Sequence, residues 1–212
     1  MKTHLTSPNE DLQTIREIME RSSKFLSLSG LSGIFAGVCA LIGVAIAWFF
    51  ILDSGQIQHH ESILNPCGLN FSAIRINLAA DALLVLGIAV LGAVYFSKRK
   101  AKKAGQLLWT NSTKRLIVHL MIPLVTGGIF AIILVFRNDL VLVTPVMLVF
   151  YGLSLVNAGK FTFGEVHYLG LTEIVLGILA AVFINLSLLF WTLGFGLMHI
   201  IYGTVMYYRY ER

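Results

Sequence analysis

Long apolar runs, separated by short polar segments, make up most of this chain. A helix needs about 20 mostly apolar residues to cross the hydrocarbon core of a bilayer. Four runs have room for one crossing each, and they cover residues 25–52, 76–96, 116–136 and 140–159. The last run, 168–208, has room for two crossings, with a tight turn at Asn185, Leu186 and Ser187. The pattern predicts an all-α fold, a polytopic membrane bundle of six transmembrane helices.

The first 24 residues follow a different pattern, in which apolar positions recur at helical spacing among many charged ones. Ser7 and Glu10 form a capping box, with Pro8 at the first helical position, which is a helix-start signal. Residues 1–24 are therefore predicted to form an amphipathic cytoplasmic helix that packs on the bundle or on a cytoplasmic partner. Residues 25–212 are predicted to form the six-helix transmembrane domain.

Composition agrees with a membrane environment, since only 13% of the residues are charged and the mean hydropathy is +0.80. The net charge of +5 does not indicate nucleic acid, because the basic excess is concentrated between the second and third spans. By the positive-inside rule that segment is cytoplasmic, which places both termini in the cytoplasm. Five of its side chains could also attract anionic lipid headgroups: Lys98, Arg99, Lys100, Lys102 and Lys103.

Similar motifs recur in the spans. GLSGIFAGVCAL from Gly30, VTGGIFAIIL from Val125 and GLTEIVLGILAA from Gly170 begin the odd spans, and the even spans end with a glycine one or two turns before the boundary. We interpret this as three tandem helical hairpins, arranged around a pseudo-threefold axis. In this alignment Glu173 takes the place of Gly33 and Gly128. A carboxyl group at a close-packing position indicates a site, or a hydrogen bond between helices.

Ionisable side chains within spans are costly unless they face protein or water. At about 1.5 Å per residue, His119, Glu173 and His199 lie about 6, 10 and 12 Å from the cytoplasmic boundary. Three polar residues of the fourth and sixth spans belong to the same layer: Tyr151, Asn157 and Tyr202. If they all face inward, they form a polar pocket open to the cytoplasm that could take a proton, a cation or a polar small molecule.

A second polar set lies in the opposite leaflet, at the start of the second span. Asn77 and Asp81 are four residues apart and share one helical face, with Arg75 just before them. Arg75 could pair with Asp81, or the set could form a polar vestibule.

Evidence for a metal or another cofactor is weak, and none is predicted. His59, His60 and Glu61 lie together in the connection after the first span, but neighbours in sequence point in different directions and no fixed-spacing motif is present. His119, Glu173 and His199 could supply two nitrogens and one carboxylate to a metal, or the two histidines could hold a haem. No catalytic sequence signature accompanies them.

The segments GLSGIFAG, HYLGLTEIVLGILA and GFGLMHIIYGTVMYY resemble a family of small six-span bacterial membrane proteins without an established function. The resemblance covers the chain and implies a six-span fold in the inner membrane of a bacterium, but it assigns no catalytic residue. Some members are automatically labelled as carotene-cleaving oxygenases. Only His119 and His199 lie clearly within spans here, too few for an all-histidine iron centre.

Three functional hypotheses follow from these residues. The first is a transporter, channel or ligand sensor, with Glu173 as the proton or cation carrier, His199 as its partner and His119 at the mouth. The second is a scaffold or regulatory subunit, in which the buried polar groups only join helices. A metal- or haem-dependent membrane enzyme is a lesser alternative. The sequence leaves open whether the chain forms homo-oligomers.

Overall fold

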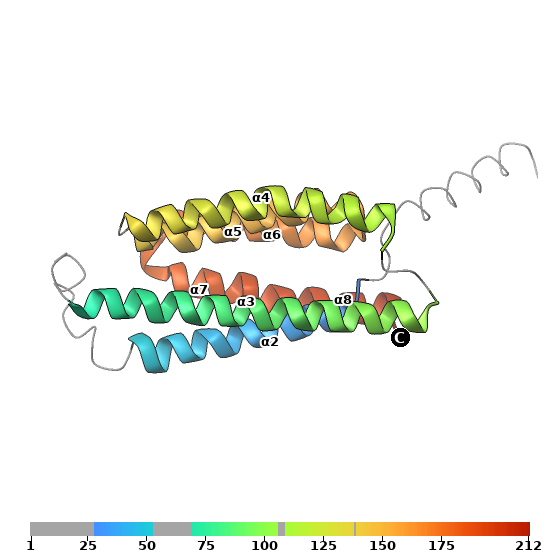
Figure 1. Ribbon diagram of the computed structural model, residues 1–212, viewed down its shortest axis with the longest axis horizontal. Coiled ribbons are helices and arrows are strands. Elements are labelled where there is room, and N and C mark those ends of the chain that lie inside the picture. The colour runs from blue at the N-terminus through green and yellow to red at the C-terminus, as the bar shows by residue number, and fades with distance from the viewer. Residues whose placement is uncertain (1–27, 53–68, 106–108, 138) are drawn as a thin grey trace, which may run out of the picture.

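Six helical crossings make up the computed structural model of the protein, which describes residues 28–52, 69–105, 109–137 and 139–212 (Figure 1). The first five crossings are α2 (Gly30–Ile46) with the π-helix η1 (Ala47–Leu52), α3 (Leu69–Lys103), α4 (Asn111–Phe136), α5 (Leu140–Gly159) and α6 (Gly164–Val182). The sixth follows a 3-10 turn, η2 (Ile184–Leu186), and consists of α7 (Ser187–Trp191), the π-helix η3 (Thr192–Met198) and α8 (His199–Tyr210).

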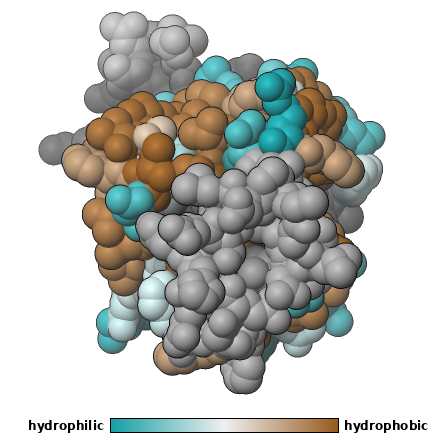
Figure 2. Space-filling model, turned by 90° about the vertical axis from the view of Figure 1, so that its left-hand side faces the viewer, coloured by the Kyte–Doolittle hydropathy of each residue, from teal (hydrophilic) through white to brown (hydrophobic). Residues whose placement is uncertain are grey.

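The predicted all-α membrane bundle is confirmed. All six crossings are long and apolar enough to span a bilayer, and large apolar side chains are exposed along them. Seen from one end, the bundle carries apolar side chains around much of its visible flanks (Figure 2). Such a surface suits lipid, because side chains as apolar as the acyl chains need no protein cover. The predicted amphipathic helix at 1–24 lies outside the described residues.

Helices α3 and α4 both extend beyond their predicted spans into the basic segment that connects them. Helix α3 continues past Phe96 to Lys103, and α4 begins at Asn111, before the predicted start at Leu116. Lysine and arginine favour helix, so the basic segment extends α3 beyond the apolar run. Thr110 caps α4, because its side chain accepts a hydrogen bond from the Thr113 backbone N–H. A run of apolar residues shows which part of a helix lies in lipid. Helix propensity and capping residues determine where the helix itself begins and ends.

The helices lie in two layers, α4, α5 and α6 in one, and α2, α3 and the sixth crossing in the other (Figure 1). Helix α3 packs on α2, α2 packs on η3 and α8, and the sixth crossing reaches α6 in the other layer. There α6 packs on α5 and α5 packs on α4. In the described chain α3 and α4 form no packed interface, so they are the two free ends of this series.

Two contacts in this series are equivalent, and we call them junctions: each joins the second helix of one hairpin to the first helix of another. In the junction of α8 with α2, a Cβ added to Gly30 would lie 2.5 Å from the Gly203 carbonyl oxygen and would also meet the Tyr207 nitrogen. Glycine at these positions lets the backbones approach closely, which is how helices associate in lipid.

The junction of α5 with α6 repeats this arrangement in the same register. A Cβ on Gly170 would lie 2.7 Å from both the Gly152 carbonyl oxygen and the Val156 nitrogen. Seven residues further along each helix the match continues, since a Cβ on Gly37 would lie 3.0 Å from the Ile200 nitrogen and one on Gly177 2.9 Å from the Val149 nitrogen. These two junctions are therefore structurally equivalent, as the sequence repeat predicts.

The third junction of a threefold arrangement, between α3 and α4, is not formed. A Cβ added to Gly128 would meet nothing within 4 Å. Gly92 lies instead against the Phe35 ring of α2, and Phe35 also packs on Phe96, with ring centroids 5.7 Å apart. The bundle departs from the predicted pseudo-threefold arrangement at this one place.

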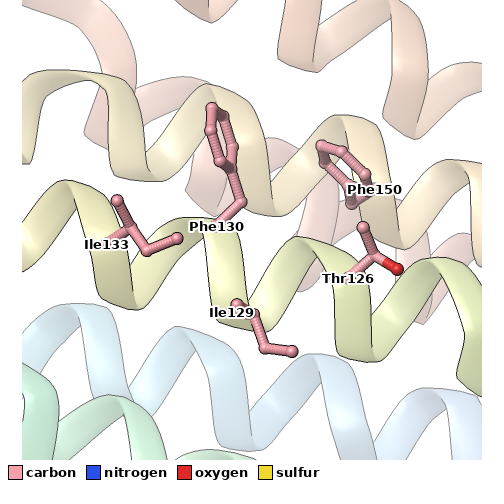
Figure 3. A pocket seen from close by; sticks show the side chains of 5 residues that line it. All are labelled: Thr126, Ile129, Phe130, Ile133 and Phe150. Carbon is pink, nitrogen blue, oxygen red and sulfur yellow. The ribbon is translucent and has the colours of Figure 1, made fainter.

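A shallow apolar groove lies between α4 and α5 (Figure 3). It has a volume of about 250 Å³ and is lined by Thr126, Ile129, Phe130, Ile133 and Phe150. The Thr126 hydroxyl donates to the Ile122 carbonyl within the helix, at 2.8 Å, so the groove offers no free polar group. Its lining is compatible with acyl chains.

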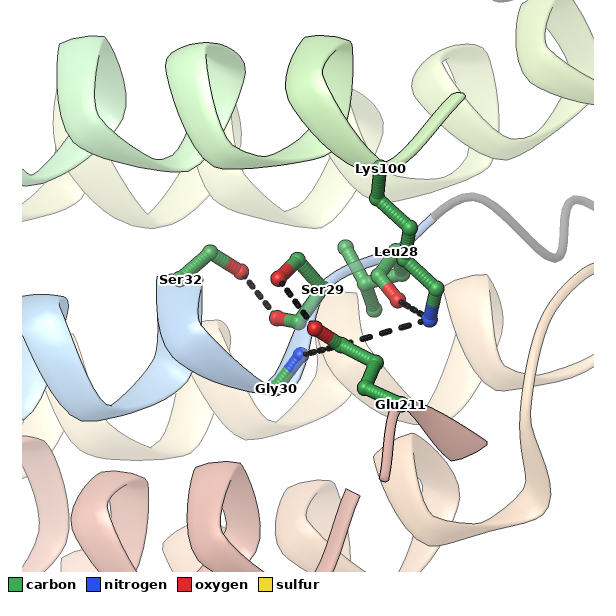
Figure 4. Close-up of polar contacts among 6 residues, drawn as sticks. All are labelled: Leu28, Ser29, Gly30, Ser32, Lys100 and Glu211. Atoms are coloured by element: carbon green, nitrogen blue, oxygen red, sulfur yellow. Dashed lines mark hydrogen bonds and ion pairs between the residues drawn. The ribbon is translucent and has the colours of Figure 1, made fainter. Parts of the chain in front are cut away.

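A polar link closes one end of the bundle, which we call the basic end because α3 and α8 both finish there (Figure 4). The Glu211 carboxylate accepts hydrogen bonds from the Gly30 backbone N–H and the Ser29 hydroxyl, at 2.5 and 3.1 Å. It also pairs with the Lys100 ammonium at 3.3 Å, and Lys100 donates to the Leu28 carbonyl at 2.6 Å. A negative charge at the first turn of α2 suits the helix dipole, so this link ties three crossings together.

The glycine junctions predict a contrast between two alanine substitutions. Gly203→Ala places a methyl group against the α2 backbone and should lower the free energy of unfolding by about 1–3 kcal/mol, the usual cost of overpacking. Gly87→Ala should leave stability unchanged or raise it by up to about 1 kcal/mol, because nothing lies within 4 Å and alanine favours helix. Unfolding in detergent checks both, and equal losses would contradict the close-packed junction.

The polar link gives a second stability prediction. Glu211→Gln weakens charge-assisted hydrogen bonds to Gly30 and Lys100 in a partly buried place, so it should cost about 1–3 kcal/mol of unfolding free energy. Asp139→Asn is the matched control, because its pairing with Arg137 at 3.8 Å is exposed and should contribute less than about 1 kcal/mol. A Glu211→Gln protein as stable as the control would show that the link is dispensable.

Candidate functional site

Glu173 and His199 meet inside the bundle, where α6 faces the start of α8. The His199 Nδ1 atom lies 3.5 Å from Glu173 Oε1, and the exposed fractions of the two side chains are 7% and 0%. The structure therefore brings together the two residues that the sequence singled out most strongly. Glu173 is fully enclosed, so the predicted pocket is not open to solvent in this structure.

The π-helix η3 creates the space for this pair. Its wider winding precedes His199 directly, and π-turns inside helices are often found at functional sites. Gly194 in η3 has no side chain, and a Cβ there would collide with Glu173 Oε2 and lie 2.8 Å from Leu148 Cδ2. A residue larger than glycine at position 194 would thus displace the carboxyl group.

Hydrogen bonds fix the proton position on His199. Its Nδ1 lies 3.0 Å from the Gly194 carbonyl oxygen, which can only accept, so Nδ1 carries the hydrogen. The neutral ring then accepts at Nε2 from the Tyr151 hydroxyl of α5, at 2.7 Å. The Tyr151 and Phe195 rings also pack on the imidazole, with centroids 5.5 and 6.0 Å away. His199 is held in one orientation by groups from two crossings.

Glu173 is the unsatisfied member of this cluster. Neither carboxyl oxygen has a hydrogen-bond partner in the described part of the chain. Buried polar groups are nearly always paired, and an unpaired one costs about 1–3 kcal/mol. His199 Nδ1 is within reach, but its hydrogen points to Gly194. The enclosed carboxyl group is the feature of this bundle that most needs a functional explanation.

The other predicted members of the layer take different positions. Tyr202 lies one turn after His199 and packs on Leu155, Val166 and Leu169, and its buried hydroxyl has no partner among the described residues. Asn157 is half-buried on α5 and makes no hydrogen bond with the cluster. His119 does not join the site: it is exposed on α4 and stacks on Phe161, with ring centroids 4.7 Å apart. The predicted mouth therefore lies outside the cluster of Glu173, His199 and Tyr151.

In the polar set at the start of α3, the structure describes the side chains of Asn77 and Asp81. Asn77 is exposed, and Asp81 is half-buried beside Gly43, where an added Cβ would lie 3.5 Å from Asp81 Oδ2. The side chain of Arg75 is outside the described part, so its predicted pairing with Asp81 stays a prediction.

The basic residues separate into two groups. Lys98, Arg99, Lys102 and Lys103 are exposed at the end of α3, as residues that meet lipid headgroups would be. Lys100 differs from this prediction, because it points inward to Glu211, is 18% exposed and lies 5.3 Å from the Phe163 ring centroid. Sequence position could not reveal this, since Lys100 stands among four similar residues.

No group of three or more metal-binding side chains occurs within the described ranges. The candidate set of His119, Glu173 and His199 is excluded by the position of His119, and His59, His60 and Glu61 lie outside the described residues.

Comparisons of the chain with protein-family models, curated proteins and solved structures find no match. The resemblance noted in the sequence stays a prediction.

Sequence reasoning did not identify Gly194 or the π-helix. The available signal was the pair Gly194 and Gly196, because two closely spaced glycines weaken α-helical winding within a span. A second missed feature was the Tyr151 hydrogen bond, which depends on how α5 and α8 face each other.

The collision between positions 194 and 173 predicts energetic coupling. Gly194→Ala should destabilise the protein by about 1–3 kcal/mol through overpacking. In a Glu173→Ala background the same change should cost clearly less, because the carboxyl group with which the Cβ would collide is gone. A double-mutant cycle on unfolding free energies measures the difference, and purely additive effects would contradict the proximity.

Proposed function

We propose that the protein is a membrane proton transporter in which Glu173 takes up and releases the transported proton. One observation carries the proposal: a carboxyl group is enclosed in a membrane bundle without a hydrogen-bond partner in the described structure, beside an oriented histidine. Intramembrane carboxyl groups of this kind mark proton relays in pumps and transporters. A residue that only joined helices would be expected to have a partner.

The chemistry of the site favours a proton over a metal cation. Ca²⁺ takes six to eight oxygen ligands, and Mg²⁺ needs an octahedral set. In the described structure Glu173 contacts one imidazole nitrogen, His199 Nδ1 at 3.5 Å, and this nitrogen already donates a hydrogen bond. A single carboxyl group in a mostly apolar setting can hold a proton as a neutral acid without further ligands.

His199 can stabilise the negative charge that forms on Glu173 when the carboxyl group loses its proton. Its Nδ1 hydrogen has two acceptors in reach, the Gly194 oxygen at 3.0 Å and Glu173 Oε1 at 3.5 Å. A hydrogen bond to an ionised carboxylate is stronger than one to a neutral carbonyl. We infer that the hydrogen stays on Gly194 while Glu173 is protonated and turns to Glu173 when the carboxylate forms, with Tyr151 keeping Nε2 as an acceptor.

The orientation is also part of the proposal. The exposed Lys98, Arg99, Lys102 and Lys103 support a cytoplasmic basic end by the positive-inside rule, in the inner membrane of a bacterium. Both termini would then be cytoplasmic, and the four side chains could bind anionic lipids.

The second candidate is a scaffold without transport activity, and the His199–Tyr151 hydrogen bond between α8 and α5 favours it. Such bonds in membranes contribute about 0.6 kcal/mol on average. In a scaffold the buried polar groups act only as contacts between helices, so substitution of Glu173 should lower stability, whereas in a transporter it should abolish proton movement.

The proposal predicts that Glu173→Gln abolishes proton movement and spares the fold. Purified protein is placed in lipid vesicles that contain a pH-sensitive dye, and an inward proton gradient is applied with potassium and valinomycin to balance charge. Uptake by Glu173→Gln should fall to the level of protein-free vesicles, because an amide cannot carry the proton. Its unfolding temperature should be unchanged, because the amide has nearly the size and shape of the carboxyl group and no hydrogen bond among the described residues is lost.

Glu165→Gln is the matched control, because Glu165 lies on the same helix and pairs with Arg209 at the basic end, at 2.8 Å. It should keep its proton uptake. Wild-type protein that moves no protons, or a Glu173→Gln variant that moves them as before, would overturn the proposal. A variant that unfolds at a lower temperature would favour the scaffold.

A further inference from the structure

The unformed junction between α3 and α4 retains glycines whose counterparts pack closely elsewhere. Gly92 on α3 corresponds to Gly203 and Gly152, which meet the backbones of α2 and α6 at the formed junctions. On α4, Gly128 corresponds to Gly33, where a Cβ would lie 3.0 Å from the Gly203 Cα atom. In this structure Gly128 has open space and Gly92 faces Phe35.

Gly128 has no structural explanation in this arrangement. Glycine inside a helix costs about 1 kcal/mol relative to alanine, and it is useful where backbones approach closely or φ is positive. Position 128 shows neither feature, since it lies in regular α-helix with open space around its Cα. A second state in which another helix approaches Gly128 would supply the missing reason.

Helix α3 is the element best able to make that approach. Along its membrane-spanning part it packs mainly on α2 and the adjoining η1, and no residue in its most apolar stretch is buried, while Lys100 at its basic end pairs with Glu211. It ends at a turn in which Gly105 has a φ of +62°, a conformation that glycine adopts without strain. The connection to α4 covers residues 104–110, longer than the 160–163 connection between α5 and α6.

We propose that α3 closes on α4 within the same chain and forms the third junction in the register of the other two. Gly92 then leaves Phe35 and packs on α4 between Val125 and Ile129, as Gly203 packs between Gly30 and Ile34 and Gly152 between Gly170 and Ile174. Phe96 comes to lie beside Val125, as Tyr207 lies beside Gly30. The structure described here is the open state.

The sequence also explains why this junction is the one that opens. Val125 stands where the formed junctions have Gly30 and Gly170, so a branched side chain keeps the two backbones further apart. Without close approach the dispersion contacts between helices weaken, and these contacts drive association in lipid. In the open state Phe35 covers Gly92, which compensates part of the lost contact. The inference rests on the repeat and does not depend on proton transport.

Disulfide trapping tests the proposed register. In a background with Cys39→Ser and Cys67→Ser, Phe96→Cys is combined with Val125→Cys, and the full-length protein is oxidised in lipid vesicles. Closure should give a bond within one chain, seen as faster migration of the monomer without reducing agent. The register control combines Phe96→Cys with Val118→Cys, two helical turns away on the same face of α4, and should give little or no bond, because a disulfide needs Cβ atoms about 3.5–4.5 Å apart.

Each other outcome overturns the proposal. Equal bonding at positions 118 and 125 would mean that α3 slides along α4 without a register. A product of twice the monomer mass would mean that a second copy occupies the α4 face. If neither pair bonds, although both thiols react with a maleimide, α3 does not reach α4.

A second variant shifts the balance between the states without adding a further cysteine. Phe35→Ala removes the ring that covers Gly92, so disulfide formation in the protein that carries Phe96→Cys and Val125→Cys should become severalfold faster. Phe130→Ala, on the groove between α4 and α5, is the matched control and should leave that rate unchanged. A Phe35→Ala protein that bonds no faster than the control contradicts the open-state role of Phe35.

Discussion

Close approach of glycine backbones is the interaction on which this bundle depends. Lipid tails are as apolar as the side chains that meet them, so the hydrophobic effect does little to choose which helices associate within a bilayer. Dispersion contacts and the loss of lipid from tight surfaces decide instead, and both grow as backbones come closer. The junctions at Gly30 with Gly203 and at Gly152 with Gly170 meet this condition, and they hold the two layers of helices internally.

The candidate site lies where the repeat departs from this rule. Glu173 stands at the position of Gly33 and Gly128, and His199 stands at the position of Leu148 and Ile88. The junction of α5 with α6 still packs closely because Gly170 and Gly177 flank Glu173. The extra volume of the carboxyl group is taken up on the side of the sixth crossing, where Gly194 and the wider π-helix make room. This repeat therefore contains the polar pair of Glu173 and His199 and still keeps the close packing of α5 on α6.

The parts of this structure that the sequence could predict are those controlled by the lipid. Span number, the close pairing of α4 with α5 and the enclosure of Glu173 and His199 follow from the cost of polar groups in hydrocarbon. The position of His119 could not be derived this way, because a residue one turn from the boundary can reach the membrane surface at little cost, and here it stacks on Phe161 outside the cluster. The inward turn of Lys100 depends on Glu211, more than a hundred residues away in the sequence. Contacts of that kind depend on how helices rotate against each other, which local patterns do not encode.

The proposed movement of α3 from Phe35 of α2 to α4 illustrates how small the energy differences between two helix arrangements in lipid are. Its lipid-facing side chains gain nothing from one orientation over another, so a phenylalanine ring on Gly92 competes directly with a glycine junction on α4. A ring contact between aromatic side chains contributes about 0.5–1.5 kcal/mol beyond area burial. In the proposed closed state Val125 would keep the α3 and α4 backbones further apart and so weaken the competing junction through lost dispersion contacts. Two arrangements separated by so little can both be populated, and membrane bundles whose repeats are imperfect are therefore well suited to motion at the imperfect junction.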